Sequence, residues 1–396
     1  MRDEHGLHEP LERFGRLHAK ALRHPGGPLD LSYPNTRTGR DPRAFELLRD
    51  LLKGASQEDL QYTPFGGSTP ARRRAASALT RRFDVPVGFR HIVLTPGGTA
   101  ALNVSLAALF APGDEVVVVT PCWMDYPLYL HRLGLRAVET HAGPEGRLDP
   151  DAIAAAFGPR TAGVIISQPV CPTGVVHSAA ELAALARVLE STARRVGRRP
   201  VLISDEVHRD QVWDGEDLTV PMQLYPDVVS VYSFGKAWSL QGQRTGYLAL
   251  GPGLRTDSHL RRLDRAMRAG GYCAPTALMQ RLVTEIADFE PDCGPLRRDQ
   301  LAVRSLLDEL GYRAVPGQGT AFVYVRCPQG DDWTFVEELA GRGLIVMPSS
   351  VFHEPGHFRL ALNLGPERHA EVARRLGPAL PGLGPASVTP RKGMPS

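Results

Sequence analysis

Short, unbroken runs of apolar residues recur along the first two thirds of the chain and alternate with longer segments of helical period. The runs are rich in β-branched residues and lie at 92–94, 115–120, 162–167, 200–204, 228–232 and 246–250. Continuous apolar strands between helices are typical of a parallel sheet that helices cover on both faces. The pattern therefore predicts an α/β fold with a mostly parallel, doubly covered sheet.

After about Arg262 the chain becomes rich in helical patterns and then shows strand-like runs at 319–325, 344–346 and 357–363. This change predicts a smaller α+β domain that the N-terminal segment completes. We expect a large domain over residues 56–262 and a small domain over 1–55 and 263–380. Residues 381–396 are rich in Pro, Gly and Ser without periodicity, which predicts a disordered tail.

The charge balance adds little to this picture, because 46 basic and 43 acidic side chains nearly cancel. We therefore expect neither a nucleic-acid partner nor a membrane surface. The five cysteines are odd in number and scattered, which favours reduced thiols. No apolar run is long enough to span a bilayer, and the first residues lack the apolar core of a signal peptide. These features favour a cytoplasmic protein.

One lysine stands in a segment suited to carbonyl chemistry. Lys236 follows the run at 228–232, with Ser233 three residues before it and Arg244 eight residues after it. A lysine in a packed, partly dehydrated turn can lose its proton and attack a carbonyl. Ser233 and Arg244 supply a hydroxyl and a bidentate guanidinium for a phosphate. Pyridoxal phosphate (PLP), held as a Schiff base, fits this set. A solvent-facing lysine in an ordinary loop is the alternative that this segment alone leaves open.

Polar residues also follow other predicted strands. Gly98 and Thr99 lie between a strand and a helix, where their N–H groups would form an anion site. Asp205 ends the strand 201–204, where a carboxylate can keep a pyridine nitrogen protonated, although an N-cap is the structural alternative. Ligands of such sheets bind at the carboxyl ends of strands, so these residues predict one site.

The segment from Ser233 to Tyr247 resembles the Ser-x-x-Lys…Gly-x-Arg-x-Gly-Tyr signature of the class I/II PLP-dependent aminotransferases, which are enzymes of fold type I. The resemblance extends from about Leu29 to about Leu380. It implies the PLP transferase fold, an amino-acid substrate, PLP as cofactor and Lys236 as the catalytic residue. It also implies a phosphate site of Gly98, Thr99, Ser233 and Arg244, a ring-stacking Trp123, Asp205 at the pyridine nitrogen, and Arg359 at the substrate α-carboxylate. Tyr62 is implied to reach the phosphate of the neighbouring subunit in a homodimer.

Three positions depart from the family pattern. Cys171, in the segment 168–174, replaces the Asn that donates a hydrogen bond to the phenolic oxygen of the cofactor, and a thiol is a weak donor. His208 replaces the Tyr that is the other partner of that oxygen. The segment 31–35 lacks the glycine that many relatives use to approach the substrate carboxylate, and we place its Tyr33 among the substrate-binding residues.

The type of reaction is the open question. The segment 204–213 resembles bacterial C–S β-lyases of the cystathionine β-lyase type, and β-elimination from a cysteine-type substrate is our leading interpretation. The run around Arg244 resembles mainstream aminotransferases instead, so transamination to a 2-oxo acid is the alternative. γ-Elimination or replacement and oxidative deamination also stay open. A PLP-binding regulator would need a DNA-binding domain, and no helix-turn-helix segment is visible.

The sequence also contains a pattern that is typical of zinc proteases. His353-Glu-Pro-Gly-His357 has the spacing His-Glu-x-x-His, which requires both histidines on one face of a helix. Pro355 and Gly356 disfavour a helix, so we expect a loop and no metal site.

Overall fold

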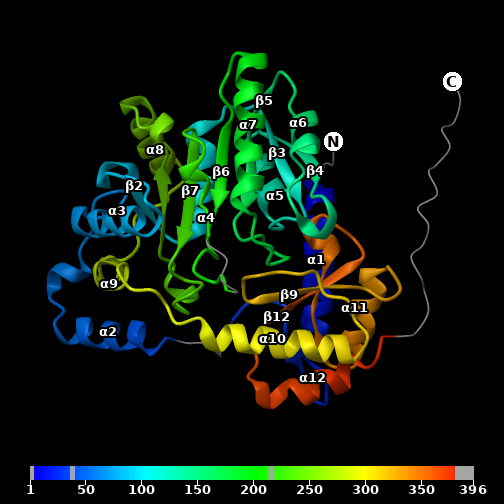
Figure 1. Cartoon of the computed structure of the whole chain (residues 1–396). Helices are drawn as coiled ribbons and strands as arrows, with labels where there is room; N and C mark the ends of the chain where they lie inside the picture. Colours follow the sequence, from blue (N-terminus) through cyan, green and yellow to red (C-terminus); the bar gives the residue numbers. More distant parts are fainter. Residues whose placement is uncertain (1–3, 36–40, 214–217, 380–396) are drawn as a thin grey trace, which may run out of the picture.

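The computed structural model describes residues 4–35, 41–213 and 218–379. The tail predicted over 381–396 lies outside these residues. A large sheet flanked by helices occupies the upper part of Figure 1, and a smaller layer of strands lies below it, above the long helix α10.

The central sheet has seven strands in the order β2-β8-β7-β6-β5-β3-β4. They are β2 Ile92–Thr95, β3 Glu115–Thr120, β4 Arg136–His141, β5 Thr161–Ser167, β6 Val201–Asp205, β7 Val228–Ser233 and β8 Gly246–Leu250. Strand β8 is antiparallel to both of its neighbours, and the other neighbouring strands are parallel. Every residue of β5 is buried, as a doubly covered strand requires. The predicted fold class is confirmed.

Helices cover the two faces of this sheet, and alternate residues of β3 reach them. Val116 and Val118 belong to an apolar cluster with α4, α5 and α8, whereas Val117 belongs to a second cluster with α3, α6 and α7. The bounds of these helices are α3 Thr69–Phe83, α4 Gly98–Leu109, α5 Tyr126–Arg132, α6 Pro150–Ala155, α7 Ala179–Val196 and α8 Asp257–Ala269. Local signals set their ends. In α7, for example, a capping box of Ser178 and Glu181 begins the helix and Gly197, with φ of 74°, ends it.

Most of the remaining elements form the smaller layer and its helices. Strands β11 Met347–Pro348, β12 His357–Ala361 and β9 Phe322–Arg326 form an antiparallel sheet in that order, and β1 Leu29–Asp30 pairs in parallel with β10 Leu344–Ile345. The N-terminal strand therefore joins the C-terminal part of the chain. The helices of this layer are α1 Glu4–Ala21, α10 Gly294–Glu309, α11 Asp332–Gly341 and α12 His369–Leu376. Two further helices, α2 Pro42–Lys53 and α9 Ala277–Ile286, pack instead into the apolar cluster that contains α3. The exact domain bounds, 56–262 against 1–55 and 263–380, stay a prediction.

Two further features concern the cysteines and the length of the apolar helices. All five cysteines are free thiols. Among the residues that the structure describes, no helix is both long and apolar enough to cross a membrane.

Candidate active site

Lys236 lies in the turn that follows β7, at the edge of the sheet where β5 and β6 also end. Burial is the main cause that lowers the pKa of this half-buried lysine. Among the ionisable groups around it, Cys171 (when ionised) and Asp205 raise the pKa of Lys236, whereas Arg359 and Arg244 lower it. The structure thus brings four of the predicted site residues to Lys236. A lysine with a lowered pKa can act as a nucleophile or as a base.

A cradle for an anion lies beside this lysine, at the start of α4. Gly97 has φ of 83°, and a Cβ there would lie 2.6 Å from Nη2 of Arg244, so the guanidinium lies against the helix start. Ser233 lies beside the same turn, because a Cβ placed on Gly98 would be 3.7 Å from the Cβ of Ser233. Thr99, in the first turn, is exposed, and no side chain caps the helix. Backbone N–H groups, a hydroxyl and a guanidinium converge here, which is the donor set that a phosphate needs.

Asp205 ends β6 and is buried, with a partner that the sequence did not reveal. The hydroxyl of Tyr126 donates to its Oδ2 at 2.7 Å, and the N–H of Val207 donates to its Oδ1 at 3.2 Å. Burial raises the pKa of Asp205, and the hydrogen bond from Tyr126 opposes that rise. The Tyr126 hydroxyl also lies 2.9 Å from Oγ of Ser167, at the end of β5. In the sequence, the only indication that Tyr126 belongs to the site was its position three residues after Trp123.

Cys171 and Trp123 lie together where this site meets the smaller layer. Cys171 is 5% exposed and forms a cluster with Phe322 and Ala361, against which the half-buried Trp123 packs. Burial raises the pKa of Cys171, so the thiol keeps its proton near neutral pH. Its Sγ accepts a hydrogen bond from Nη1 of Arg359 at 3.8 Å. Cys171 therefore contacts the arginine that the sequence assigned to the substrate.

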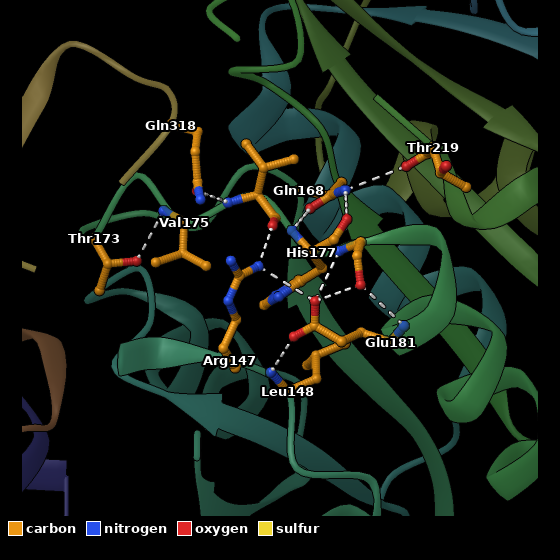
Figure 2. Close-up of polar contacts among 11 residues, drawn as sticks. Arg147, Leu148, Gln168, Thr173, Val175, His177, Glu181, Thr219 and Gln318 are labelled. Atoms are coloured by element: carbon orange, nitrogen blue, oxygen red, sulfur yellow. Dashed lines mark hydrogen bonds and ion pairs between the residues drawn. The ribbon is translucent and has the colours of Figure 1, made fainter. Parts of the chain in front are cut away.

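The loop that carries Cys171 is held by a polar network behind it (Figure 2). Gln168 donates from Nε2 to the carbonyl oxygens of His177 at 2.8 Å and Thr219 at 3.2 Å, and its Oε1 accepts from the N–H of His177 at 2.9 Å. Gln318 reaches the same loop from the other layer and accepts from the N–H of Val176 at 3.1 Å. Contacts from both layers therefore fix the path of this loop.

His208 is buried next to the same cluster, with its ring centroid 5.4 Å from that of Phe322 in an edge-on arrangement. Burial lowers the pKa of His208 to about 3, so the ring is neutral at physiological pH. Its Nδ1 lies 2.8 Å from Oε1 of Gln211, which can only accept. The proton of the ring is therefore assigned to Nδ1, and Nε2 is left as an acceptor.

Arg359, on β12, is 0% exposed and makes no salt bridge within the described parts of the chain. Its guanidinium lies over the rings of Phe322 and Phe352, with 4.2 and 4.6 Å between its Cζ and the ring centroids. Nη2 donates to the carbonyl oxygen of Ser32 at 2.8 Å and lies 3.5 Å from Sδ of Met347, while Nε has no hydrogen-bond partner among the described residues. A buried cation without a counter-ion is costly and provides a strong site for an anion.

Tyr33 and Tyr62, the two tyrosines that the sequence analysis placed at the site, differ in their burial. Tyr33 follows Ser32 and is 45% exposed; burial raises its pKa, whereas the nearby Arg359 lowers it. Because Ser32 accepts a hydrogen bond from Arg359, the partly exposed Tyr33 lies next to a residue that contacts Arg359. Tyr62 is fully exposed, so within one chain it does not enter the buried site.

The zinc-protease pattern does not form a helix. His353 has φ of 66° at the end of a short 3-10 helix, and His357 is the first residue of β12. The His357 ring stacks on Tyr324, with centroids 4.8 Å apart, and its Nδ1 lies 3.6 Å from Oε2 of Glu354. The described residues contain no group of three or more His, Cys, Asp or Glu side chains that could hold a metal ion.

Comparison with known proteins agrees with this arrangement. Residues 29–376 match the family aminotransferase class I and II. The chain is 28% identical over 338 residues to the aspartate/prephenate aminotransferase of Thermus thermophilus, covering 83% of this chain and 85% of the relative. It is 30% identical over 328 residues to a probable N-succinyldiaminopimelate aminotransferase of Mycobacterium tuberculosis, covering 79% of each. The crystal structure of an amino transferase from Eubacterium rectale superposes with a TM-score of 0.85 at 23% identity, over 95% of this chain and 94% of that one.

The chain belongs to the class I and II aminotransferase family and is a PLP-dependent enzyme of fold type I that acts on amino acids. The residues present fit the cofactor. The cradle at the start of α4 suits its phosphate, the buried Asp205 carboxylate offers an acceptor for its ring nitrogen, and Lys236 offers the amine. The relatives do not support β-elimination, our leading interpretation, and they favour transamination, the alternative.

Proposed function

We propose that this enzyme is an aminotransferase that moves the amino group of an α-amino acid to a 2-oxo acid. The observation that carries the proposal is the buried Arg359. Its charge lowers the pKa of Lys236, and it has no carboxylate partner among the described residues. A substrate α-carboxylate would supply that partner. The family relatives support amino-group transfer as the outcome.

Several residues would hold PLP. Gly98, Thr99, Ser233 and Arg244 would bind its phosphate, and the half-buried indole of Trp123 would stack on its ring. Asp205 would accept a hydrogen bond from the pyridine nitrogen, while Tyr126 keeps that carboxylate oriented. Cys171 and His208 would flank the phenolic oxygen. When bound, PLP supplies the aldehyde that takes the amino group and a ring that stabilises negative charge at the substrate Cα.

The protein's own groups would then bind the substrate and move a proton. Arg359 would exchange its weak sulfur contacts with Cys171 and Met347 for a bidentate bond to the α-carboxylate. This bond would orient the Cα–H toward Lys236, whose neutral amine would take the proton. Tyr33, which follows the Ser32 that contacts Arg359, would contact the bound substrate. The protonated amine of Lys236 would then hold that proton beside the bound cofactor and substrate, within the same buried site.

The active form is proposed to be a homodimer, in which Tyr62 of one subunit reaches the phosphate in the other. The segment from α2 to the start of α3 exposes Phe45, Leu52, Leu60 and Phe65 beside Tyr62, with 70%, 54%, 75% and 40% of their surface accessible. An exposed apolar segment of this kind is typical of a protein–protein interface. Light scattering should give twice the mass of one chain, and Tyr62→Phe should weaken PLP retention without changing that mass.

One experiment tests transamination against the lyase interpretation. The PLP-loaded enzyme is incubated with a panel of amino acids, including S-substituted cysteines, with and without 2-oxo acids. We expect pyridoxamine phosphate without the oxo acid and a new amino acid with it. Pyruvate and thiol released from S-substituted cysteines, without pyridoxamine phosphate, would favour β-elimination instead. That is the reaction of the lyases that the segment around His208 resembles.

A further inference from the structure

The orientation of the Arg359 guanidinium depends on one backbone oxygen. Among the described residues, the carbonyl oxygen of Ser32 is the only oxygen that accepts a hydrogen bond from Arg359, at 2.8 Å from Nη2. The other two hydrogen-bond acceptors of Arg359 are the sulfur atoms of Cys171 at 3.8 Å and Met347 at 3.5 Å. An amide oxygen is a stronger acceptor than a thiol or a thioether. The position of the fully buried Ser32 therefore fixes the plane of the guanidinium.

Asn363 follows β12, and its side chain holds the backbone on both sides of Ser32. Nδ2 of Asn363 donates to the carbonyl oxygens of Asp30 at 3.1 Å and Tyr33 at 2.6 Å. Its Oδ1 accepts from the N–H of Asn35 at 2.8 Å. This side chain is buried, and both hydrogens of its amide and its oxygen are engaged with the backbone of one short segment. Asn363 therefore closes the segment 30–35 around Ser32.

Contacts with α1 hold the same segment from another direction. Oδ1 of Asp30 accepts from the N–H of Ser32 at 3.0 Å and from its Oγ at 2.5 Å, and Oδ2 lies 2.8 Å from Nε2 of His18 on α1. The ring of Tyr33 packs edge-on against Phe14 and His18, with ring centroids 6.0 and 5.8 Å apart. The segment is thus held by α1 and by the residues at the end of β12.

We propose that Asn363 is a positioning residue, which keeps the Ser32 carbonyl oxygen against Arg359 and so holds the guanidinium in the orientation that receives the substrate α-carboxylate. The proposal rests on the proposed function, which places that carboxylate on Arg359. A bidentate bond needs a guanidinium in one fixed plane, and an arginine that must first be ordered binds its ligand more weakly. Asn363 acts only through this backbone segment, because its polar atoms have no hydrogen-bonding capacity left for a substrate.

The test measures carboxylate binding to the PLP-loaded enzyme by calorimetry, with butanoate and 3-phenylpropionate as probes that carry no amino group. Asn363→Ala should weaken binding of both probes about tenfold, which corresponds to about 1.4 kcal/mol, and should leave the PLP content unchanged. The control is Gln223→Ala, which removes an amide that donates to the carbonyl oxygen of Phe83 and accepts from the N–H of Val220, both at 2.9 Å. Both variants should lower the free energy of unfolding, and only Asn363→Ala should weaken probe binding. Asp30→Asn keeps the shape of its side chain but weakens the bonds to Ser32, so it should weaken probe binding even if Asn363→Ala does not fold.

A double-mutant cycle shows whether Asn363 acts through Arg359. In the Arg359→Lys background, Asn363→Ala should weaken probe binding by less than about twofold, because a lysine has no guanidinium plane to orient. If the two substitutions multiply their effects on the dissociation constant, Asn363 acts independently of Arg359 and the proposal is overturned.

The same measurements separate this proposal from the proposed function. If amino transfer occurs but Asn363→Ala binds both probes as the wild type does, the positioning role is overturned and the proposed function stands. If probe binding weakens as expected but no amino acid transfers its amino group, the proposed function fails and the positioning role stands. A wild type that binds neither the probes nor any amino acid would overturn both.

Discussion

The hydroxyl of Tyr126 donates a hydrogen bond to Oδ2 of Asp205 and also lies within hydrogen-bond distance of Ser167, so one side chain links the ends of two parallel strands. Because β5 and β6 are neighbours in the sheet, this link holds the carboxylate in one orientation at the centre of the site. Asp205 is buried, and a buried carboxylate depends on each of its donors.

Tyr126→Phe should therefore weaken both folding and catalysis. Loss of one donor to a buried charged acceptor costs about 1–3 kcal/mol, and we expect kcat to fall by about tenfold or more. The control is Tyr225→Phe, which removes a buried hydroxyl that donates to the carbonyl oxygen of Pro200 at 2.7 Å. Both variants should lower the free energy of unfolding, measured by urea titration, and only Tyr126→Phe should lower kcat. Equal kcat in the two variants would show that the link is only structural.

Lys236 should be the single site of covalent attachment. The chain has only four lysines, Lys20, Lys53, Lys236 and Lys392, so the test is unambiguous. Borohydride added to the PLP-loaded protein should fix the label on the peptide that contains Lys236, because its lowered pKa makes it the reactive amine. Lys236→Ala should keep PLP only non-covalently and lose turnover, while Lys53→Ala should behave as wild type. A label on any other lysine contradicts the assignment.

Arg359→Lys should separate charge from geometry at the proposed carboxylate site. A lysine keeps the positive charge but cannot form the paired bonds of a guanidinium. We expect KM to rise by about tenfold to a hundredfold and kcat to fall as well, because the contact both binds and orients the substrate. Arg375→Lys is the control, since this buried arginine pairs with Glu371 at 2.6 Å and should affect stability alone. Unchanged steady-state kinetics in Arg359→Lys would remove this residue from the substrate site.

Cys171→Asn should shift the pH at which the visible band of the bound cofactor changes. In the wild type, the protonated thiol is a weak donor and His208 offers only an acceptor at Nε2, so the phenolic oxygen would have poor donors. An unsupported negative oxygen holds the neighbouring proton more tightly, which raises the apparent pKa of the band. An Asn donor stabilises the charged oxygen, so the midpoint should fall, and His208→Tyr should act in the same direction.

The control for this titration is Cys327→Ala, which removes a buried thiol from a different apolar cluster and should leave the midpoint unchanged. A midpoint that stays or rises in Cys171→Asn would place Cys171 away from the phenolic oxygen.

The strands that the sequence predicted correctly are those buried on both faces, such as 115–120 and 246–250. Burial on both faces demands an unbroken apolar run, which is visible without a structure. Strand β4, Arg136–His141, was missed because it lies at the edge of the sheet and is largely exposed, so most of its residues are polar and no apolar run marks it. The antiparallel direction of β8 was also hidden, since an apolar run has the same composition in either direction.

By itself, the sequence determined the fold class and the motif around Lys236, because burial and a short signature are local properties of the chain. Tertiary structure alone decided that Tyr126 supports Asp205 and that Cys171 contacts Arg359. These pairs are far apart in the chain, and they meet because parallel strands end at one edge and the smaller layer packs against it. Binding of a charged group at Arg359 depends on such meetings, since the energy between two charges is set by their distance in space.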